Sequence, residues 1–191
     1  MAILTRTTGY LVTSEDWNEL VNAINATSVE LSVDITDCFY LPTEINAAGI
    51  EQVNSGIGTP APCWNNVLFD AGTTEYMKYK FVVPENWGAG GTLKIGFYGT
   101  ATSGSVVFQA GVVGLGAAQA TSCNFGTAVL GTFTVNGTAG VRTLGTLAFI
   151  DLNGIAAGAK AMLYLERIGT ATADNAGGDC KVDKVMFCYE S

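Results

Sequence analysis

The sequence predicts an all-β protein, an antiparallel β-sandwich of jelly-roll type preceded by one short N-terminal α-helix and an extended arm. From residue 67 onward, apolar residues alternate with polar ones at a period of two, which is typical of half-buried strands. About eight such stretches follow one another between turns rich in Gly, Asn and Thr, with no helical period between them. A single stripe of helical period stands ahead of them.

The helix is predicted over residues 14–26, with Thr13 as its cap. Its apolar residues have the spacing i, i+3, i+4, i+7 and form one narrow stripe: Trp17, Leu20, Val21 and Ile24. A helix of only a few turns is marginal by itself, so the stripe has to pack on something. We therefore expect it to act as an anchor, buried against the protein's own body, a sister subunit or another protein.

An extended arm follows the helix, with a strand expected over 31–41 because Leu31, Val33 and Ile35 alternate with polar residues. Residues 42–66 then hold three of the four prolines and several glycines, which is typical of an irregular linker. We place the boundary here, between an N-terminal anchor (1–66) and a jelly-roll domain (67–191).

The jelly-roll domain is expected to contain eight short strands, whose order in the sheets does not follow from the pattern. Residues 77–83 present one apolar face opposite Lys78 and Lys80, and residues 93–97 repeat this alternation. The other six strands are expected at 67–71, 105–113, 128–135, 143–150, 161–168 and 181–189.

Charge and composition exclude several classes of function. The net charge is −8, so the chain lacks the positive field that holds nucleic acid and is repelled by anionic lipid headgroups. No histidine is present, which excludes a Ser-His-Asp relay and an HExxH zinc site. No secretory signal and no apolar run long enough to span a membrane are visible, so we expect a soluble protein made in the cytoplasm.

A long uncharged tract is the strongest clue to assembly. The 47 residues from 95 to 141 carry no charge, although exposed sheet edges of monomers normally carry charges that prevent association. A surface of Gly, Ala and Thr that is merely uncharged is the alternative. We expect neighbouring copies of the chain to cover much of this tract.

Five cysteines occur without a CxxC spacing, and in a reducing cytosol we expect them to be small buried hydrophobes. A zinc site built from four thiols has no ligand spacing in its favour, so no metal and no cofactor are expected. The five are Cys38, Cys63, Cys123, Cys180 and Cys188.

Carboxylates and aromatic rings are the remaining candidates for a site. Asp174, Asp179 and Asp183 cluster near the end of the chain, where carboxylates could hydrolyse a glycosidic bond or several oxygens could hold calcium. The spacing does not match an EF-hand loop, and turns use Asp simply to bond their own backbone. Rings can stack on sugars, but packing at the core or rim is the alternative for each of them. The candidate rings are Tyr10, Trp64, Trp87 and Tyr98. We expect no catalytic residue, and the residues expected to face a ligand are Trp64, Asp174 and Asp179.

Several ordered motifs resemble a group of tailed-bacteriophage virion proteins with jelly-roll domains, and the likeness covers roughly residues 67–189. Residues 9–22 (GYLVTSEDWNELVN) also resemble the N-terminal attachment segment of phage baseplate, tail or head-accessory proteins. The motifs of the jelly-roll region are FVVPENWG (81–88), GTLKIGFY (91–98), ATSGSVVF (101–108), LYLERIG (163–169) and DNAGGD (174–179).

The resemblance implies a non-enzymatic virion component, made in the host cytoplasm, that forms a homotrimer. It would be a capsid decoration, cement or head-fibre protein, attached to the major capsid protein or another virion protein by its N-terminal segment. The alternative is a tail-fibre or baseplate adhesin whose jelly roll binds a host surface glycan. A third hypothesis is a polysaccharide depolymerase that uses the carboxylates near the end of the chain.

Overall fold

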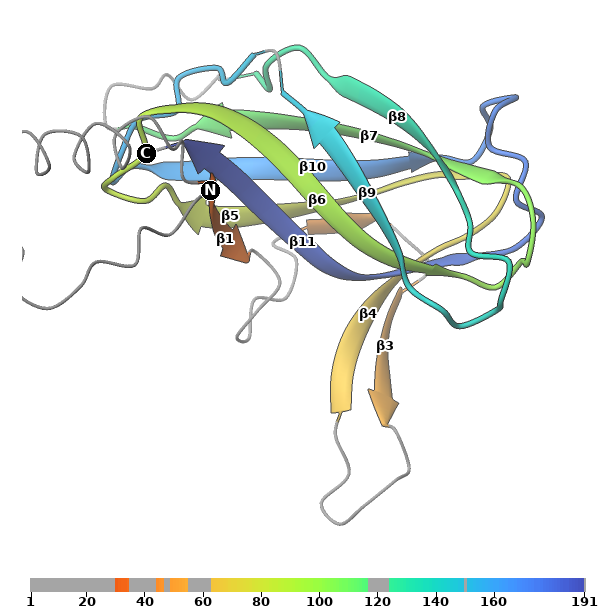
Figure 1. Ribbon diagram of the computed structural model, residues 1–191. Coiled ribbons are helices and arrows are strands. Elements are labelled where there is room, and N and C mark those ends of the chain that lie inside the picture. The colour runs from red at the N-terminus through yellow and green to blue at the C-terminus, as the bar shows by residue number, and fades with distance from the viewer. Residues whose placement is uncertain are drawn as a thin grey trace, which may run out of the picture.

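The protein folds as two facing antiparallel β-sheets in the computed structural model (Figure 1). The residues that the structure describes contain no helix, and they are 30–34, 44–46, 49–54, 63–116, 124–149 and 151–190. Accordingly, none of them forms a helix that could cross a membrane. The helix expected over 14–26 lies outside these residues.

The described residues form eleven strands in the two sheets, and their bounds follow in chain order. They are β1 (Glu30–Asp34), β2 (Glu44–Asn46), β3 (Gly49–Asn54), β4 (Cys63–Phe69), β5 (Thr74–Val82), β6 (Ala89–Gly99), β7 (Ser105–Gly114), β8 (Val129–Thr134), β9 (Thr143–Ala148), β10 (Lys160–Ile168) and β11 (Cys180–Glu190).

The strand order is that of a jelly roll. One sheet, here called the β11 sheet, has the order β3-β4-β11-β6-β9, with β1 also paired to β11; the other, the β10 sheet, has the order β2-β5-β10-β7-β8. From β4 to β11 every connection crosses between the sheets except the one from β7 to β8. The predicted two-sheet sandwich is therefore confirmed.

The eight strands expected between residues 67 and 189 all form, as β4 to β11. Their apolar faces meet between the sheets, where Met77, Leu93, Ile95 and Phe97 are fully buried. Aromatic edges fill the centre; the rings of Phe97 and Phe108 meet at 5.3 Å between centroids and 72° between planes. Such pairs add roughly 0.5–1.5 kcal/mol to the burial of their area.

The segment before residue 67 contributes strands to the same two sheets. β1 pairs with the last part of β11, where β4 no longer runs beside it, and β2 pairs with β5. β3 and β4 form a hairpin that projects from the sandwich (Figure 1). Residues 44–46, 49–54 and 63–66, expected to be irregular, are therefore strands, because ladder pairing overrides their weak local pattern. The division into two domains stays a prediction.

Only part of the uncharged tract is buried inside one copy of the chain, because in residues 124–141 Val135 alone is buried. It contains β7, whose side chains are buried on both faces: Phe108 points into the core, while the outward-facing Val107 and Val113 are 1% and 2% exposed. The backbone N–H of Val107 donates to the Asp174 carboxylate at 2.9 Å, and that of Gly126 donates to the Val112 carbonyl at 3.0 Å. The chain's own loops thus cover β7, which was expected to need neighbouring copies.

Candidate functional site

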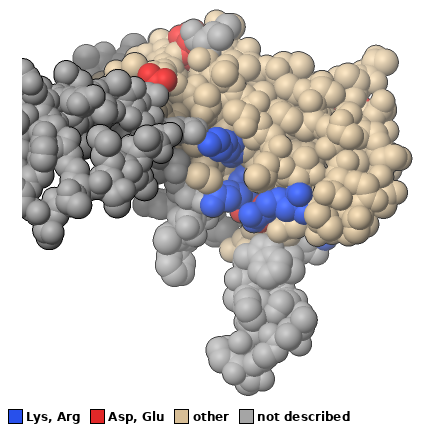
Figure 2. All heavy atoms as spheres, viewed as in Figure 1, with Lys and Arg blue, Asp and Glu red and all other residues tan. Residues whose placement is uncertain are grey.

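The outer face of the β11 sheet carries a group of cationic side chains. Because Leu93, Ile95 and Phe97 point into the core, the alternate residues of β6 point outward. Four of the nine Lys and Arg residues of the chain lie on β6, on β11 or just before β9, and Figure 2 shows cationic side chains gathered across this face. These four are Lys94, Arg142, Lys181 and Lys184.

A β-bulge in β11 brings a carboxylate onto this face. The register with β6 shifts between Val182 and Lys184, so Asp183 is the extra residue. Its carboxylate accepts hydrogen bonds from Arg142 Nη2 and from the Tyr98 hydroxyl, the latter at 3.2 Å. The Asp183 side chain is only 4% exposed, and its Oδ1 has no hydrogen-bond partner. We call Tyr98, Arg142 and Asp183 the Arg142 cluster.

Gly96 makes room for the Arg142 cluster. A Cβ atom at Gly96 would lie 2.9 Å from Asp183 Oδ1 and 3.3 Å from Arg142 Nε. The missing side chain therefore lets the carboxylate and the guanidinium lie close to the sheet. The Arg142 guanidinium carbon lies 5.8 Å from the centroid of the Tyr98 ring, within cation–π range.

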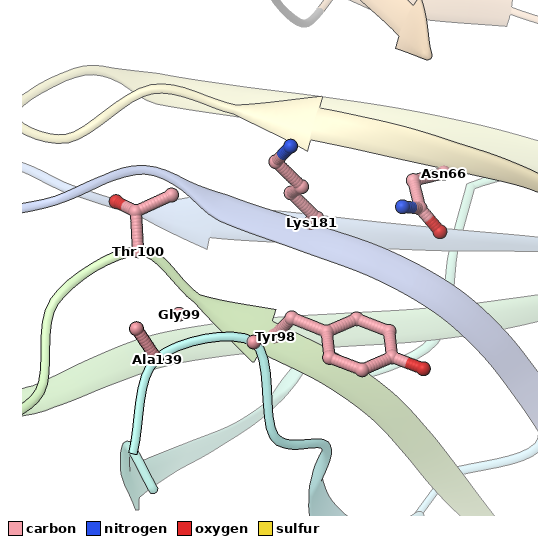
Figure 3. Close-up of a pocket in the computed structure, with 7 residues that line it drawn as sticks. Asn66, Tyr98, Gly99, Thr100, Ala139 and Lys181 are labelled. Atoms are coloured by element: carbon pink, nitrogen blue, oxygen red, sulfur yellow. The ribbon is translucent and has the colours of Figure 1, made fainter. Parts of the chain in front are cut away.

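A hollow of about 390 Å³ lies on the Tyr98 side of the cluster, and we call it the Tyr98 hollow. Figure 3 shows that its walls come from β4, β6, β11 and the loop between β8 and β9. Asn66 is 3% exposed, and its Oδ1 has no hydrogen-bond partner. The described residues that line the hollow are Asn66, Tyr98, Gly99, Thr100, Ala139, Gly140 and Lys181.

A second hollow, of about 370 Å³, lies on the Arg142 side of the cluster, and we call it the basic hollow. It combines three cationic side chains with two apolar ones, and Leu144 is 71% exposed. Its described lining residues are Lys94, Gly96, Arg142, Leu144, Gly145, Thr146, Lys184 and Met186.

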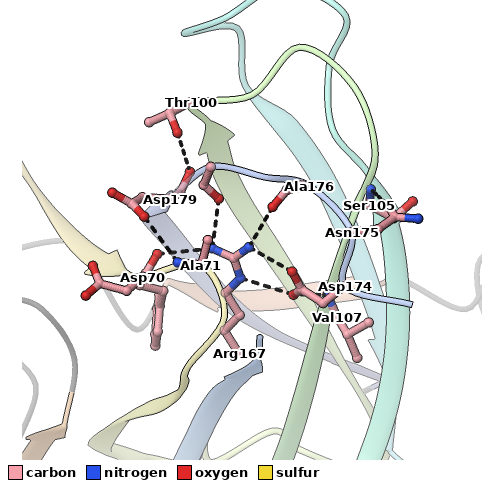
Figure 4. A network of polar contacts seen from close by, with 12 residues as sticks. Asp70, Ala71, Thr100, Ser105, Val107, Arg167, Asp174, Asn175, Ala176 and Asp179 are labelled. Atoms are coloured by element: carbon pink, nitrogen blue, oxygen red, sulfur yellow. Dashed lines mark hydrogen bonds and ion pairs between the residues drawn. The ribbon is translucent and has the colours of Figure 1, made fainter. Parts of the chain in front are cut away.

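Asp174 does not face a ligand, contrary to the prediction from the sequence. Its side chain is 1% exposed, and both carboxylate oxygens accept hydrogen bonds from Arg167, at 2.8 and 3.1 Å (Figure 4). Burial by itself lowers the pKa of Arg167, but the hydrogen bond and the charge of Asp174 outweigh it, and the pKa is raised above its usual value. This carboxylate is committed to a buried ion pair.

Of the other residues expected to face a ligand or a partner, the structure describes the side chain of Asp179 alone. Asp179 is exposed, and its Oδ1 accepts a hydrogen bond from the backbone N–H of Ala71 at 3.1 Å, which is a loop-bracing contact. Trp64 lies on β4, but its side chain is outside the described part of the structure. The anchor residues Trp17, Leu20, Val21 and Ile24 also lie outside the described residues.

The structure also describes the surroundings of Trp87 and of two cysteines. Trp87 packs against the core and its indole N–H donates to the Gly90 carbonyl at 3.1 Å, so it has the rim-packing role rather than a stacking one. Cys180 and Cys188 are buried, as expected of small hydrophobes. Burial raises the pKa of the Cys180 thiol to about 12. Among the described residues no group of three or more potential metal ligands occurs.

Asn66 and Arg142 were not singled out from the sequence, although a signal for Arg142 existed. Lys94 and Arg142 are the two charges that bound the uncharged tract, and the fold places both at the basic hollow. Consecutive polar residues at Asp183 and Lys184 also break the alternation of β11, which is typical of a bulge. Asn66 carried no signal, because it fell in the passage expected to be a linker.

No known protein family and no curated protein matches this chain. Among solved structures, a CBM35 from Cellvibrio japonicus Abf62 is 11% identical, with a TM-score of 0.48, covering 83% of this chain and 92% of its own. The CBM22-1 xylan-binding domain from Paenibacillus barcinonensis Xyn10C is 11% identical, with a TM-score of 0.45, covering 85% and 95%. A family 11 carbohydrate-binding module from Clostridium thermocellum is 12% identical, with a TM-score of 0.45, covering 84% and 96%. Likeness at this level carries no argument about a ligand.

Proposed function

We propose that the jelly roll is a non-catalytic glycan-binding module and that the Tyr98 hollow is its binding site. The proposal rests on the chemistry of that hollow. An aromatic ring and an amide from β6 and β4, an ammonium group from β11 and the Thr100 hydroxyl just after β6 line it, so segments far apart in the sequence contribute to one hollow. Concave sites with an apolar body and a few convergent polar groups are typical binding sites for small molecules.

The observation that carries the proposal is the unpartnered Oδ1 of Asn66. A buried acceptor without a donor costs about 1–3 kcal/mol. Because Asn66 Oδ1 is itself closed off from solvent, the side chain has to turn toward the hollow for a ligand donor to reach it, and the new hydrogen bond would then remove this cost. Sugar hydroxyls donate hydrogen bonds, and the apolar faces of sugar rings pack on aromatic rings such as that of Tyr98. A glycan therefore satisfies both the polar and the apolar part of this hollow.

A binding role without catalysis is supported by the ion pairs that hold two of the three candidate carboxylates. Asp174 is held by Arg167, and Asp183 by Arg142 and Tyr98. Hydrolysis of a glycosidic bond normally needs two carboxyl groups that flank the scissile bond, one acting as an acid. Two carboxylates that already pair with guanidinium groups are poorly placed for that role.

The setting of the module is a proposal that rests on the sequence. The resemblance to phage virion proteins supports a virion component that is attached through residues 1–66 and assembles as a homotrimer. Within that setting the glycan-binding hollow favours the adhesin over the capsid decoration, because an adhesin has to recognise a host surface while a decoration only has to hold a shell.

The test is a glycan array probed with the full chain, with two variants of Tyr98 and with one control variant. Tyr98→Ala removes the ring from the hollow and is expected to weaken binding about tenfold, while Tyr98→Phe keeps the ring and loses only the hydroxyl bond to Asp183. The matched control is Tyr76→Ala, which removes a partly exposed tyrosine from the β10 sheet and is expected to bind like the parent.

Two results would contradict the proposal. One is a full chain that binds no glycan on the array. The other is equal weakening by Tyr98→Ala and Tyr76→Ala, because a site in the Tyr98 hollow cannot depend on a side chain of the opposite sheet.

A further inference from the structure

We propose that the basic hollow binds an acidic group of the glycan, a carboxylate or a sulfate, so that the ligand class is an acidic glycan whose charges are widely spaced. This inference rests on the proposed function and adds the chemical class of the ligand. It uses a different hollow and different side chains, so the two can fail separately.

The first support is the concentration of positive charge on a protein of net charge −8. Lys94, Arg142 and Lys184 line one hollow, and the lining residues that the structure describes include no Asp or Glu. The register explains the grouping. Gly96 lies opposite both Leu144 and Lys184, and Lys94 lies one outward position along β6 from it. Three adjacent strand segments therefore present their cations to the same depression.

The second support is the preorganised position of Arg142. Its Nη2 donates to Asp183 and its guanidinium lies over the Tyr98 ring, while the side chain remains 41% exposed. A guanidinium has five N–H donors in a planar fork that matches the two oxygens of a carboxylate. Asp183 thus holds one side of the fork, and the other side is available to an acidic group in the hollow.

The third support is continuity between the two hollows. Tyr98 lines one hollow, Arg142 lines the other, and the two side chains are in contact through the cluster. An oligosaccharide longer than one sugar can therefore stack on Tyr98 and place an acidic substituent against Arg142. Leu144 and Met186 supply apolar surface for the body of the sugar beside that substituent.

The net charge favours widely spaced acidic groups over a dense polyanion. Duplex DNA carries about one charge per 1.7 Å and would meet the acidic remainder of this protein along its length. At physiological salt, charges beyond about 8 Å are screened. The three cations of the hollow exceed the one carboxylate beside them, that of Asp183, so the local charge attracts a single acidic substituent without the more distant acidic residues repelling it.

The experiment is calorimetric titration of the full chain with oligosaccharides of equal length: a hyaluronate fragment with one carboxylate per two sugars, a kappa-carrageenan fragment with one sulfate per two sugars, and a neutral cello-oligosaccharide. We expect at least one acidic ligand to bind about tenfold more tightly than the neutral one, and the excess to vanish at high salt. The variant Lys94→Gln/Lys184→Gln is expected to lose this excess while keeping the affinity for the neutral ligand.

The matched control is Lys78→Gln/Lys80→Gln, which changes the net charge equally but lies on the outer face of the β10 sheet. It is expected to keep the excess, and an equal loss in both variants would overturn the inference, because net charge alone would then explain it. If circular dichroism shows a lower midpoint of thermal unfolding for Lys94→Gln/Lys184→Gln than for the parent, the two single variants are titrated instead.

The remaining outcomes separate the two proposals. Equal affinity for acidic and neutral ligands overturns the acidic ligand and leaves the glycan-binding function standing. Failure of every oligosaccharide to bind overturns the glycan-binding function. Tighter binding of a single-stranded oligonucleotide, with the same dependence on Lys94 and Lys184, would assign the hollow to nucleic acid and overturn the glycan class.

Discussion

Arg167 is a buried cation that links the two sheets through hydrogen bonds. It lies on β10, is fully buried, and uses all five of its N–H donors. The acceptors are the Asp174 carboxylate and the backbone carbonyls of Phe69, Gly178 and Ala176. One guanidinium therefore ties the end of β4 and the segment before β11 to the opposite sheet (Figure 4).

Arg167→Met is expected to lower the free energy of unfolding by about 3–5 kcal/mol, because it leaves the Asp174 carboxylate buried without a cation. Urea denaturation followed by tryptophan fluorescence measures this. Lys160→Met, at the exposed start of the same strand, should stay within about 0.5 kcal/mol of the parent. The double variant Arg167→Met/Asp174→Leu should recover part of the loss; a single variant as stable as the parent would contradict the role of this pair.

At the scale of elements, the end of β7 is fixed by a close approach between two backbone segments. β7 ends at Gly114, whose N–H donates to the Asn153 carbonyl at 2.8 Å. A Cβ at this position would lie 1.8 Å from the Gly154 carbonyl oxygen and 2.7 Å from the Ile155 nitrogen. No flexible side chain is present to move aside, so the loop before β10 can lie on β7 only if residue 114 is a glycine.

Gly114→Ala is therefore expected to destabilise the protein by about 1–3 kcal/mol or more, as other overpacked sites do. Gly116→Ala is the matched control two residues further on, where nothing lies within 4 Å of an added Cβ. Thermal unfolding should show a lower midpoint for the first variant and an unchanged or slightly higher one for the second. Equal midpoints for the two variants would show that the loop is free to move away from β7.

At the scale of the whole molecule, one chain leaves less apolar surface for contacts between copies than the sequence indicated. The uncharged tract indicated neighbouring copies, but β7 is buried by its own sandwich and loops. The described residues still expose some large apolar side chains outside the core. These are Val82, Leu130, Val141 and Leu144, which are 43% to 71% exposed. Leu144 also lines the basic hollow, so the proposed trimer depends on Val82, Leu130 and Val141 and on residues 1–66, whose part in assembly is inferred from the sequence alone.

Sedimentation velocity of the full chain tests the trimer. The proposal expects one species with three times the mass of a single chain, across micromolar concentrations and with little effect of salt, because apolar contacts are not screened. A monomer at every concentration would contradict the trimer without affecting the glycan-binding proposal, since the described lining residues of both hollows come from one chain.

The alternation of apolar residues was sufficient to predict the class of fold and eight strands, because a period of two follows from the geometry of one strand and needs no partner. The strand order, the bulge at Asp183 and the place of Asn66 beside Tyr98 could not be predicted in this way. They depend on pairing between segments distant in the chain, such as β4 with β11, and the free energy of that pairing has no local signature. The same reason explains Asp174, whose local pattern is that of a turn but whose partner, Arg167, became evident only when the sheets had come together.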